Sequence, residues 1–245
     1  MCRNALFPGA LLWVALSGCI KDDAEAPDRA PGTRVALRFE HHCDGMPFQR
    51  DSLCTDGFGT LVRFDQVRFA IVGARLLGNE EDQVFCDEPN GVFVADLLAP
   101  DRTVDLAVDR TGEIHWMDTR PVRTTDRFPG LLDSLMVTGP AGTFPAQLDV
   151  RGVYDSDDNG RIDASDHPFR IAVPADAVGS PLRIHAHTLV PPSAPSELAV
   201  AVNLTALLRD IDLPDEPITI GQGPYATQAL FNFRTRVLGA DNKPL

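Results

Sequence analysis

Short stretches of alternating hydrophobic and polar residues run through most of the chain after position 33, and turn-forming clusters separate them. In residues 34–42, for example, every second side chain from Val35 to Phe39 is apolar, while Arg38 and Glu40 fall on the other face. Period-two alternation is typical of a strand with one buried face. Because such stretches recur and helical periodicity is scarce, the sequence predicts an all-β fold, an antiparallel β-sandwich with long loops.

The predicted strands are rich in β-branched and aromatic residues and cover residues 34–42, 61–77 (as one or two strands), 92–98, 103–108, 131–137, 144–154, 169–173, 182–190 and 197–203. Residues 112–128 are polar and lack a clear period, so we expect a long loop there. Residues 204–211 favour a helical segment capped by Asn203 or Thr205. Residues 225–237 fit either a last strand or a helix.

Residues 155–166 form a calcium-binding loop pattern of the EF-hand type. A hard cation takes about six to eight oxygen ligands, and such a loop supplies them from fixed positions. The expected ligands are Asp155, Asp157, Asn159, the backbone carbonyl of Arg161, Asp163 and Asp166. Gly160 stands where the loop must turn sharply. Aspartate in place of glutamate at the last position resembles the loops of dockerins.

An acidic surface turn is the alternative interpretation of this loop, because Asp, Asn and Gly form turns in any case. Pro168 directly after the loop argues against an exiting helix, and a strand is predicted to follow. The pattern therefore predicts a structural calcium that joins two strands, rather than a switch that moves helices.

The amino terminus has the pattern of a bacterial lipoprotein signal. A basic start at Arg3 precedes an apolar run over residues 5–16 and a small-residue site that ends at Cys19. This site resembles a lipobox, which implies cleavage after residue 18 and lipid attachment to the Cys19 thiol. An ordinary signal peptide with an incidental cysteine is the alternative.

Residues 19–32 are rich in Asp, Ala and Pro, and we expect a flexible tether there, followed by a single domain over residues 33–245. Ile20, rather than Asp, follows the cysteine and favours the outer membrane. The sequence thus predicts an envelope protein that is anchored by its lipid and faces either the periplasm or the cell surface.

The chain is acidic, with a formal net charge of -13 and an isoelectric point near 4.7. This charge argues against nucleic acid as a partner, because no basic patch exists to displace counterions, and it leaves metal cations open. Beyond residue 19 the cysteines are Cys43, Cys54 and Cys86. In an oxidising compartment we expect one disulfide, most simply Cys43 with Cys54, although Cys86 could replace either partner.

Five of the six histidines fall into three groups, which are His41 with His42, His115 beside Trp116, and His185 with His187. Two imidazoles at positions i and i+2 of one strand point the same way and can chelate zinc or copper, or simply form a polar face in water. The sequence contains none of the G-x-S-x-G, H-E-x-x-H or phosphate-loop motifs, so no enzyme is predicted.

Three segments carry a family resemblance, namely Phe39-Glu40-His41-His42-Cys43-Asp44-Gly45-Met46-Pro47-Phe48, Val67-Arg68-Phe69 and Ala74-Arg75-Leu76-Leu77. Together they resemble the opening of the MbnP-like family of bacterial periplasmic copper-binding proteins. The run Arg183-Ile184-His185-Ala186-His187 looks like related lipoprotein-borne members, and the resemblance covers most of residues 35–213.

This resemblance implies copper held by histidines and, in some members, by an oxidatively modified tryptophan. Carried over by position, His41 matches the first-strand histidine, and Trp116 is the candidate for the tryptophan role. With His115, His185 and His187 they form the predicted copper set. We therefore expect a lipid-anchored, calcium-stabilised, non-catalytic copper-binding protein. The alternative is a calcium-dependent adhesion or scaffold lipoprotein without a transition metal.

Overall fold

The computed structural model describes residues 33–49, 51–97, 103–123, 125–126, 135–175 and 181–238. The predicted signal peptide over residues 1–18, the lipidation site at Cys19 and the tether over residues 19–32 lie outside the described residues. The same holds for the first half of the strand predicted over residues 131–137.

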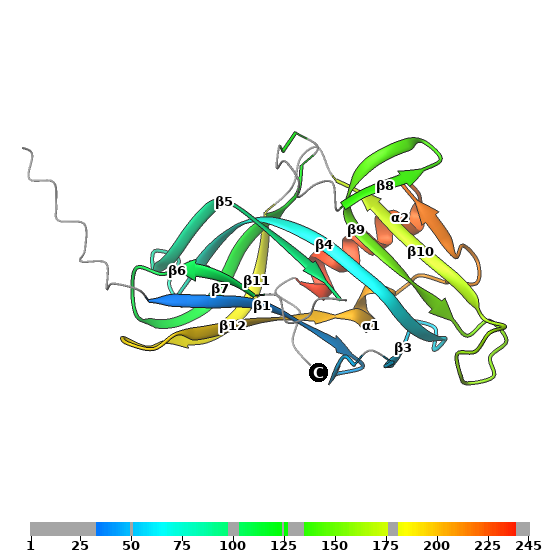
Figure 1. Cartoon of the computed structure of the whole chain (residues 1–245), viewed down its shortest axis with the longest axis horizontal. Coiled ribbons are helices and arrows are strands. Elements are labelled where there is room, and N and C mark those ends of the chain that lie inside the picture. Colours follow the sequence, from blue (N-terminus) through cyan, green and yellow to red (C-terminus); the bar gives the residue numbers. More distant parts are fainter. Residues whose placement is uncertain are drawn as a thin grey trace, which may run out of the picture.

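Within the described residues the strands form two sheets that face each other as a sandwich (Figure 1). The larger sheet has the order β11-β7-β4-β9-β10-β13, with β3 and β5 also paired to β4, and β8 paired to β9. Its strands are β3 (Leu53–Thr55), β4 (Leu61–Leu77), β5 (Val84–Asp96), β7 (Gly112–Pro121), β8 (Met136–Gly139), β9 (Gly142–Tyr154), β10 (His167–Pro174), β11 (Leu182–Val190) and β13 (Ile218–Ile220). The predicted all-β sandwich is confirmed.

The smaller sheet has the order β12-β1-β2, with β6 also paired to β1. Its strands are β1 (Arg34–Cys43), β2 (Met46–Pro47), β6 (Thr103–Ala107) and β12 (Ser196–Asn203). Most pairs in both sheets are antiparallel, but β1 with β12 and β10 with β13 run parallel. The sequence did not predict these parallel pairs, because alternation marks the buried face of a strand and carries no information about its direction.

The core between the sheets is centred on aromatic side chains from three parts of the chain. The Phe69 ring of β4 meets Phe39 of β1 edge to face, with centroids 5.4 Å apart. On another side it meets Phe233, with centroids 5.0 Å apart. All three side chains are buried, and such edge-to-face contacts contribute about 0.5–1.5 kcal/mol beyond burial. The two sheets and the C-terminal helical segment therefore share one core.

The helical segments are short and lie late in the chain. The helix α1 (Leu204–Leu207) begins after Asn203, whose side-chain oxygen accepts a hydrogen bond from the Ala206 amide at 3.2 Å. It is shorter than predicted. The ambiguous region over residues 225–237 is helical, as α2 (Pro224–Asn232) continued by the π-helical turn η2 (Phe233–Val237). No helix among the described residues is long and apolar enough to cross a membrane.

One prediction is wrong in a way that affects the functional site. Residues 112–128 were expected to form a long loop, but their first part is the strand β7, between β11 and β4 in the larger sheet. The buried side chains of β7 include Thr119, whose hydroxyl donates to the Val72 carbonyl at 3.1 Å. A polar residue on the buried face, satisfied only by tertiary contact, hides the alternation that marks a strand.

Candidate metal-binding sites

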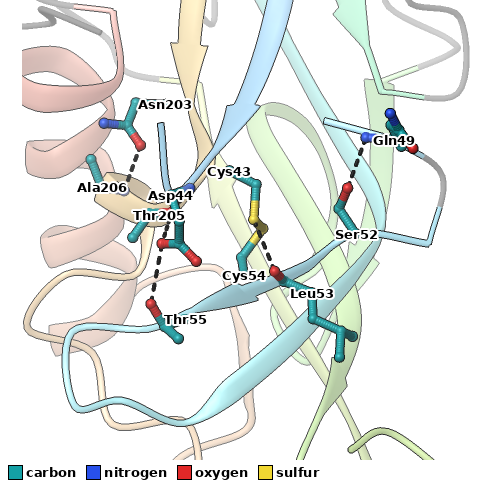
Figure 2. The surroundings of a disulfide bond; sticks show 10 residues. All are labelled: Cys43, Asp44, Gln49, Ser52, Leu53, Cys54, Thr55, Asn203, Thr205 and Ala206. Carbon is teal, nitrogen blue, oxygen red and sulfur yellow. Dashed lines mark hydrogen bonds between the residues drawn. A yellow bond between two sulfur atoms is a disulfide. The ribbon is translucent and has the colours of Figure 1, made fainter. Parts of the chain in front are cut away.

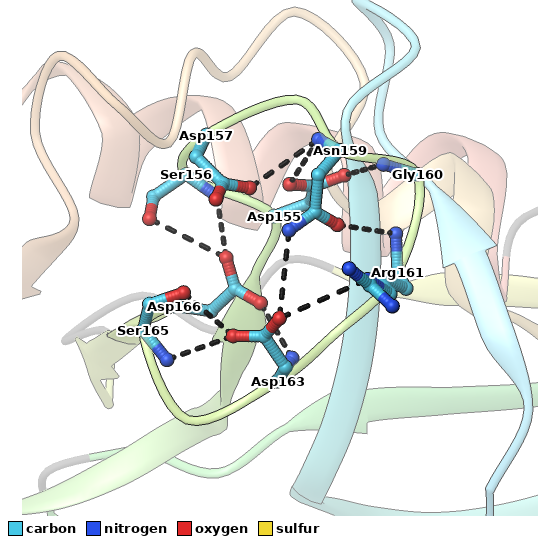
Figure 3. Close-up of polar contacts among 9 residues, drawn as sticks. All are labelled: Asp155, Ser156, Asp157, Asn159, Gly160, Arg161, Asp163, Ser165 and Asp166. Carbon is cyan, nitrogen blue, oxygen red and sulfur yellow. Dashed lines mark hydrogen bonds and ion pairs between the residues drawn. The ribbon is translucent and has the colours of Figure 1, made fainter.

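The aspartate loop, residues 155–166, joins β9 directly to β10 (Figure 3). The two strands are paired up to the loop itself, with Tyr154 opposite His167. The Asp155 amide donates to the Leu61 carbonyl of the neighbouring β4 at 2.9 Å. Both ends of the loop are therefore fixed by the larger sheet, with strands rather than helices on either side.

The first half of the loop is organised around the buried carboxylate of Asp155. This carboxylate accepts hydrogen bonds from the amides of Gly160 at 2.8 Å and Asn159 at 3.1 Å. Burial raises the pKa of the Asp155 carboxyl, but these backbone hydrogen bonds lower it and the net pKa lies below the ordinary value. Gly160 has φ +78°, a conformation that suits glycine. The loop thus holds its first aspartate in the charged form at a fixed place.

The second half of the loop folds back through Asp163 and Asp166. Asp166 accepts from the Ser156 amide with one oxygen at 2.9 Å and from the Asp163 amide with the other at 2.7 Å. Asp163 accepts from the Ser165 amide at 2.9 Å, and hydrogen bonds from Ser165 lower the pKa of Asp163. Asp166 therefore closes the ring, and the aspartate at the last position reaches the start of the loop.

Carboxylate oxygens of Asp155, Asp157 and Asp166 lie within 4.8 Å of one another. Like charges this close repel each other, and a divalent cation would relieve that repulsion. Asn159 and Asp163 approach the same ring, with Asn159 Nδ2 3.5 Å from Asp163 Oδ2. The Arg161 amide donates to Asn159 Oδ1 at 3.1 Å. The loop thus gathers carboxylate oxygens of three predicted ligands, Asp155, Asp157 and Asp166, and places Asn159 and Asp163 beside them (Figure 3).

A second group of possible ligands lies where β7 and β11 are paired, and we call Glu113, His115 and His187 the histidine cluster. Ligand atoms of all three lie within 4.8 Å of one another. The rings of His115 and His187 are 5.2 Å apart between centroids, and His115 Nε2 is 3.4 Å from Glu113 Oε2. Next to the cluster, Trp116 and His185 meet edge to face at 5.2 Å. The strand pairing therefore brings together four of the five residues predicted for copper.

A β-bulge in β11 brings His187 close to His115. At this point Ala186 and His187 of β11 together stand opposite the single residue His115 of β7. On β7, His115 and Trp116 are both half-buried, although neighbours in a regular strand point to opposite faces. Bulges redirect side chains in this way, and they are common next to functional sites. Each of the two histidines is thus turned toward the other by local irregularity.

Sequence reasoning missed Glu113. It belongs to the segment that was expected to be a loop, and in a loop the residue spacing does not predict the direction in which a side chain points. Glu113 and His115 are spaced i and i+2, the spacing that places two side chains on one face of a strand. That signal would have found Glu113 if the segment had been interpreted as a strand.

His41 does not join the histidine cluster. It lies on β1, opposite Val202 of β12. The strand β11, which carries His187, contacts β12 at Glu197, whose carbonyl accepts a hydrogen bond from the Thr188 hydroxyl at 2.8 Å. Glu197 and Val202 are five residues apart on β12. At about 3.3 Å per residue, the distance along β12 between the positions of Glu197 and Val202 is about 17 Å. His41 is also buried, with 6% of the residue exposed, and burial lowers its pKa to about 4. The structure therefore separates His41 from the other predicted copper ligands.

A disulfide joins Cys43 at the end of β1 to Cys54 in β3, with Cα atoms 5.4 Å apart (Figure 2). Because β1 belongs to the smaller sheet and β3 to the larger one, this bond links the two sheets. Beside it, Asp44 accepts hydrogen bonds from the hydroxyls of Thr205 at 2.8 Å and Thr55 at 3.2 Å.

Comparison with known proteins finds no matching family model and no matching curated protein. Among solved structures the chain is similar to MbnP from Methylosinus trichosporium, with 12% sequence identity and a TM-score of 0.49. The match covers 78% of this chain and 81% of that one.

Proposed function

We propose that the protein is a non-catalytic metal-binding protein that holds copper at the histidine cluster. The observation that carries this proposal is the approach of the Glu113, His115 and His187 ligand atoms to within 4.8 Å of one another. Two imidazoles and a carboxylate are N and O donors that suit Cu(II), which such sites bind more tightly than the other divalent first-row metals. The family resemblance of the sequence supports the same metal.

Trp116 and His185 flank the copper site in this proposal. The edge of one ring meets the face of the other at 5.2 Å, and Trp116 directly follows His115 in the chain. His185 extends the donor set on the exposed side of β11. Trp116 is the sole tryptophan beyond the predicted signal peptide, so its emission reports on the site directly.

The test is a Cu(II) titration of the mature protein followed by Trp116 emission. We expect saturable quenching at one copper per chain, and His187→Ala should weaken the affinity about 100-fold because a ligand is lost. The matched control is His167→Ala, which removes an exposed histidine of β10 and should leave the affinity unchanged. If the native protein shows no saturable copper binding, the proposal is wrong and the calcium-dependent scaffold alternative is favoured.

The aspartate loop is proposed to hold a calcium ion with a structural role. Support comes from the three carboxylates gathered within 4.8 Å, from the left-handed turn at Gly160 and from the match of loop positions to a calcium-binding pattern. Strands at both ends fix the loop, so calcium would stabilise the β9–β10 connection and would not drive a large movement.

Anchoring of the protein in the bacterial envelope through a lipid on Cys19, with the outer membrane as its location, is also proposed. This part depends on the sequence alone, on the small-residue site that ends at Cys19 and on Ile20 after it. Expression of Cys19→Ser with fractionation tests it. The variant should leave the membrane fraction and lose lipid labelling, and lipid labelling that persists would contradict the assignment.

A further inference from the structure

A cavity of about 850 Å³ lies between β1 and the start of β4, away from both candidate metal sites. It lies where β1 changes partners, because β6 pairs with β1 as far as Arg38 and β2 pairs with it only from His42. Between these points the described strands leave that edge of β1 uncovered, apart from a hydrogen bond from the Phe48 amide to the His41 carbonyl at 2.8 Å. The volume is in the range of small-molecule sites in proteins.

The inner wall of this cavity is aromatic and apolar, with Phe39, Phe48, Phe64 and Leu97 among its lining residues. Phe64 is held edge to face against Phe169 of β10, with centroids 6.0 Å apart, so that wall is preorganised by the core. Phe48, in contrast, is only half-buried and packs against the core from its margin. Aromatic walls of this kind favour a flat aromatic ligand through offset and edge-to-face contacts.

His41 is the more deeply buried of two histidines in this wall with an unpartnered ring nitrogen, the other being His42 with its Nδ1. His41 is 6% exposed, and neither of its ring nitrogens has a hydrogen-bond partner among the described residues. Leaving a buried polar group unsatisfied costs about 1–3 kcal/mol, so its presence calls for an explanation. Because burial lowers the pKa of His41 to about 4, the ring is neutral at pH 7 and offers one donor and one acceptor.

The charged residues at the rim do not favour an anionic ligand. Arg38 donates to Glu197 at 2.7 Å and also pairs with Glu40, while Arg63 donates to Asp65 at 3.1 Å. Both cations of the rim are therefore engaged by carboxylates. An anion would meet these acids, and the chain as a whole has a formal net charge of -13.

We propose that this cavity binds a small uncharged aromatic alcohol, with its rings against Phe48 and Phe64 and its hydroxyl hydrogen-bonded to His41. A hydroxyl both donates and accepts, so it pairs with either tautomer of the neutral ring. Because the His41 nitrogens are closed to solvent in this conformation, the proposed hydrogen bond requires the ring to rotate toward the cavity. The site is independent of the proposed copper and calcium sites.

The probe is 2-naphthol, with naphthalene as the matched compound that lacks the hydroxyl. Both are titrated calorimetrically into the mature protein in calcium-containing, copper-free buffer, so the outcome does not depend on copper binding. In the native protein we expect saturable binding of 2-naphthol. His41→Phe should lower the ratio of naphthol to naphthalene affinity about tenfold, the effect of one lost hydrogen bond. The control His167→Phe should keep the native ratio.

A second variant, Phe48→Ala, tests the cavity independently in case His41→Phe does not fold. Phe48→Ala removes half-buried ring contact at the cavity margin and should weaken both compounds by a similar factor. The proposal is overturned if 2-naphthol shows no saturable binding up to its solubility. It is also overturned if the affinity ratio is the same in His41→Phe as in the native protein, or if Phe48→Ala leaves both affinities unchanged.

Discussion

The aspartate loop and the histidine cluster gather candidate metal ligands in opposite ways. All the oxygen donors of the loop come from one continuous stretch, residues 155–166, and its own backbone amides hold them in place. The donors of the cluster come from β7 and β11, which are distant in sequence, and they meet only because the strands pair with a bulge between His185 and Thr188. One site is encoded locally, and the other is created by the sheet.

The two sites also differ in charge. The loop concentrates carboxylates that repel one another, so a cation bound there should stabilise the folded chain. Imidazole binds metals as a neutral group, so the cluster can exist without a metal at little electrostatic cost. Calcium should therefore be visible in thermal stability, whereas copper should be visible mainly in the emission of Trp116.

The largest expected effect is on the calcium response of the loop. With calcium at about 100 times its dissociation constant, binding to the native state contributes about 2.7 kcal/mol, or roughly 5–10 °C in Tm for a domain of this size. Asp155→Ala should abolish this shift, because Asp155 is the buried aspartate that organises the loop. Thermal unfolding followed by circular dichroism, with and without calcium, measures it.

Asp158→Asn is the matched control for this change. Asp158 is exposed and has φ +55°, a conformation that asparagine also tolerates, and it is not one of the predicted ligands. The calcium shift should survive in this variant. A calcium shift that persists in Asp155→Ala would reduce the loop to an acidic turn.

A smaller effect tests whether Glu113 belongs to the proposed copper site. Glu113→Ala removes the carboxylate that lies 3.4 Å from His115 Nε2, and it should weaken Cu(II) binding about tenfold, or about 1.4 kcal/mol. Glu80→Ala, an exposed acid in the turn after β4, is the control and should leave the affinity unchanged. Equal losses in the two variants would mean that overall charge, and not a ligand, is responsible.

The smallest expected effect concerns Cys86, the soft ligand that could compete for copper. Cys86 is buried, and burial together with the charges of Glu88, Asp109 and Asp87 raises the pKa of its thiol to about 11. At pH 7 only roughly one thiol in ten thousand is then ionised, and the thiolate is the form that binds metals. Cys86→Ala should therefore not change the copper affinity at pH 7.

The pH dependence gives this prediction its sign. The thiolate population rises as the pH approaches 11, so any contribution of Cys86 should appear only in alkaline solution and grow with pH. Copper titrations of the native protein and Cys86→Ala at pH 7 and pH 9 make the comparison. A weaker affinity of the variant at pH 7 would move the copper site from the histidines to the thiol.

Much of the fold could be predicted because alternation directly reports which face of a strand is buried. The strands β1, β4, β9, β10, β11 and β12 lie where the pattern placed them, within a few residues. Strand β7 was missed because Thr119 occupies a buried position and the irregularity at His115 and Trp116 breaks the period. The helical form of the C-terminal segment, including Phe233, was left open because short apolar runs fit both periods.

The sequence by itself determined the aspartate loop, since a contiguous pattern needs only local turns and backbone amides to place its side chains. It also predicted His115, Trp116, His185 and His187 as candidate metal ligands. Only the tertiary structure decided that these four meet, that Glu113 joins them and that His41 stands apart, in the wall of a separate cavity. The physical reason is that strand register and a single bulge decide which distant side chains share a face. Neither can be predicted from the alternation of residues along one strand.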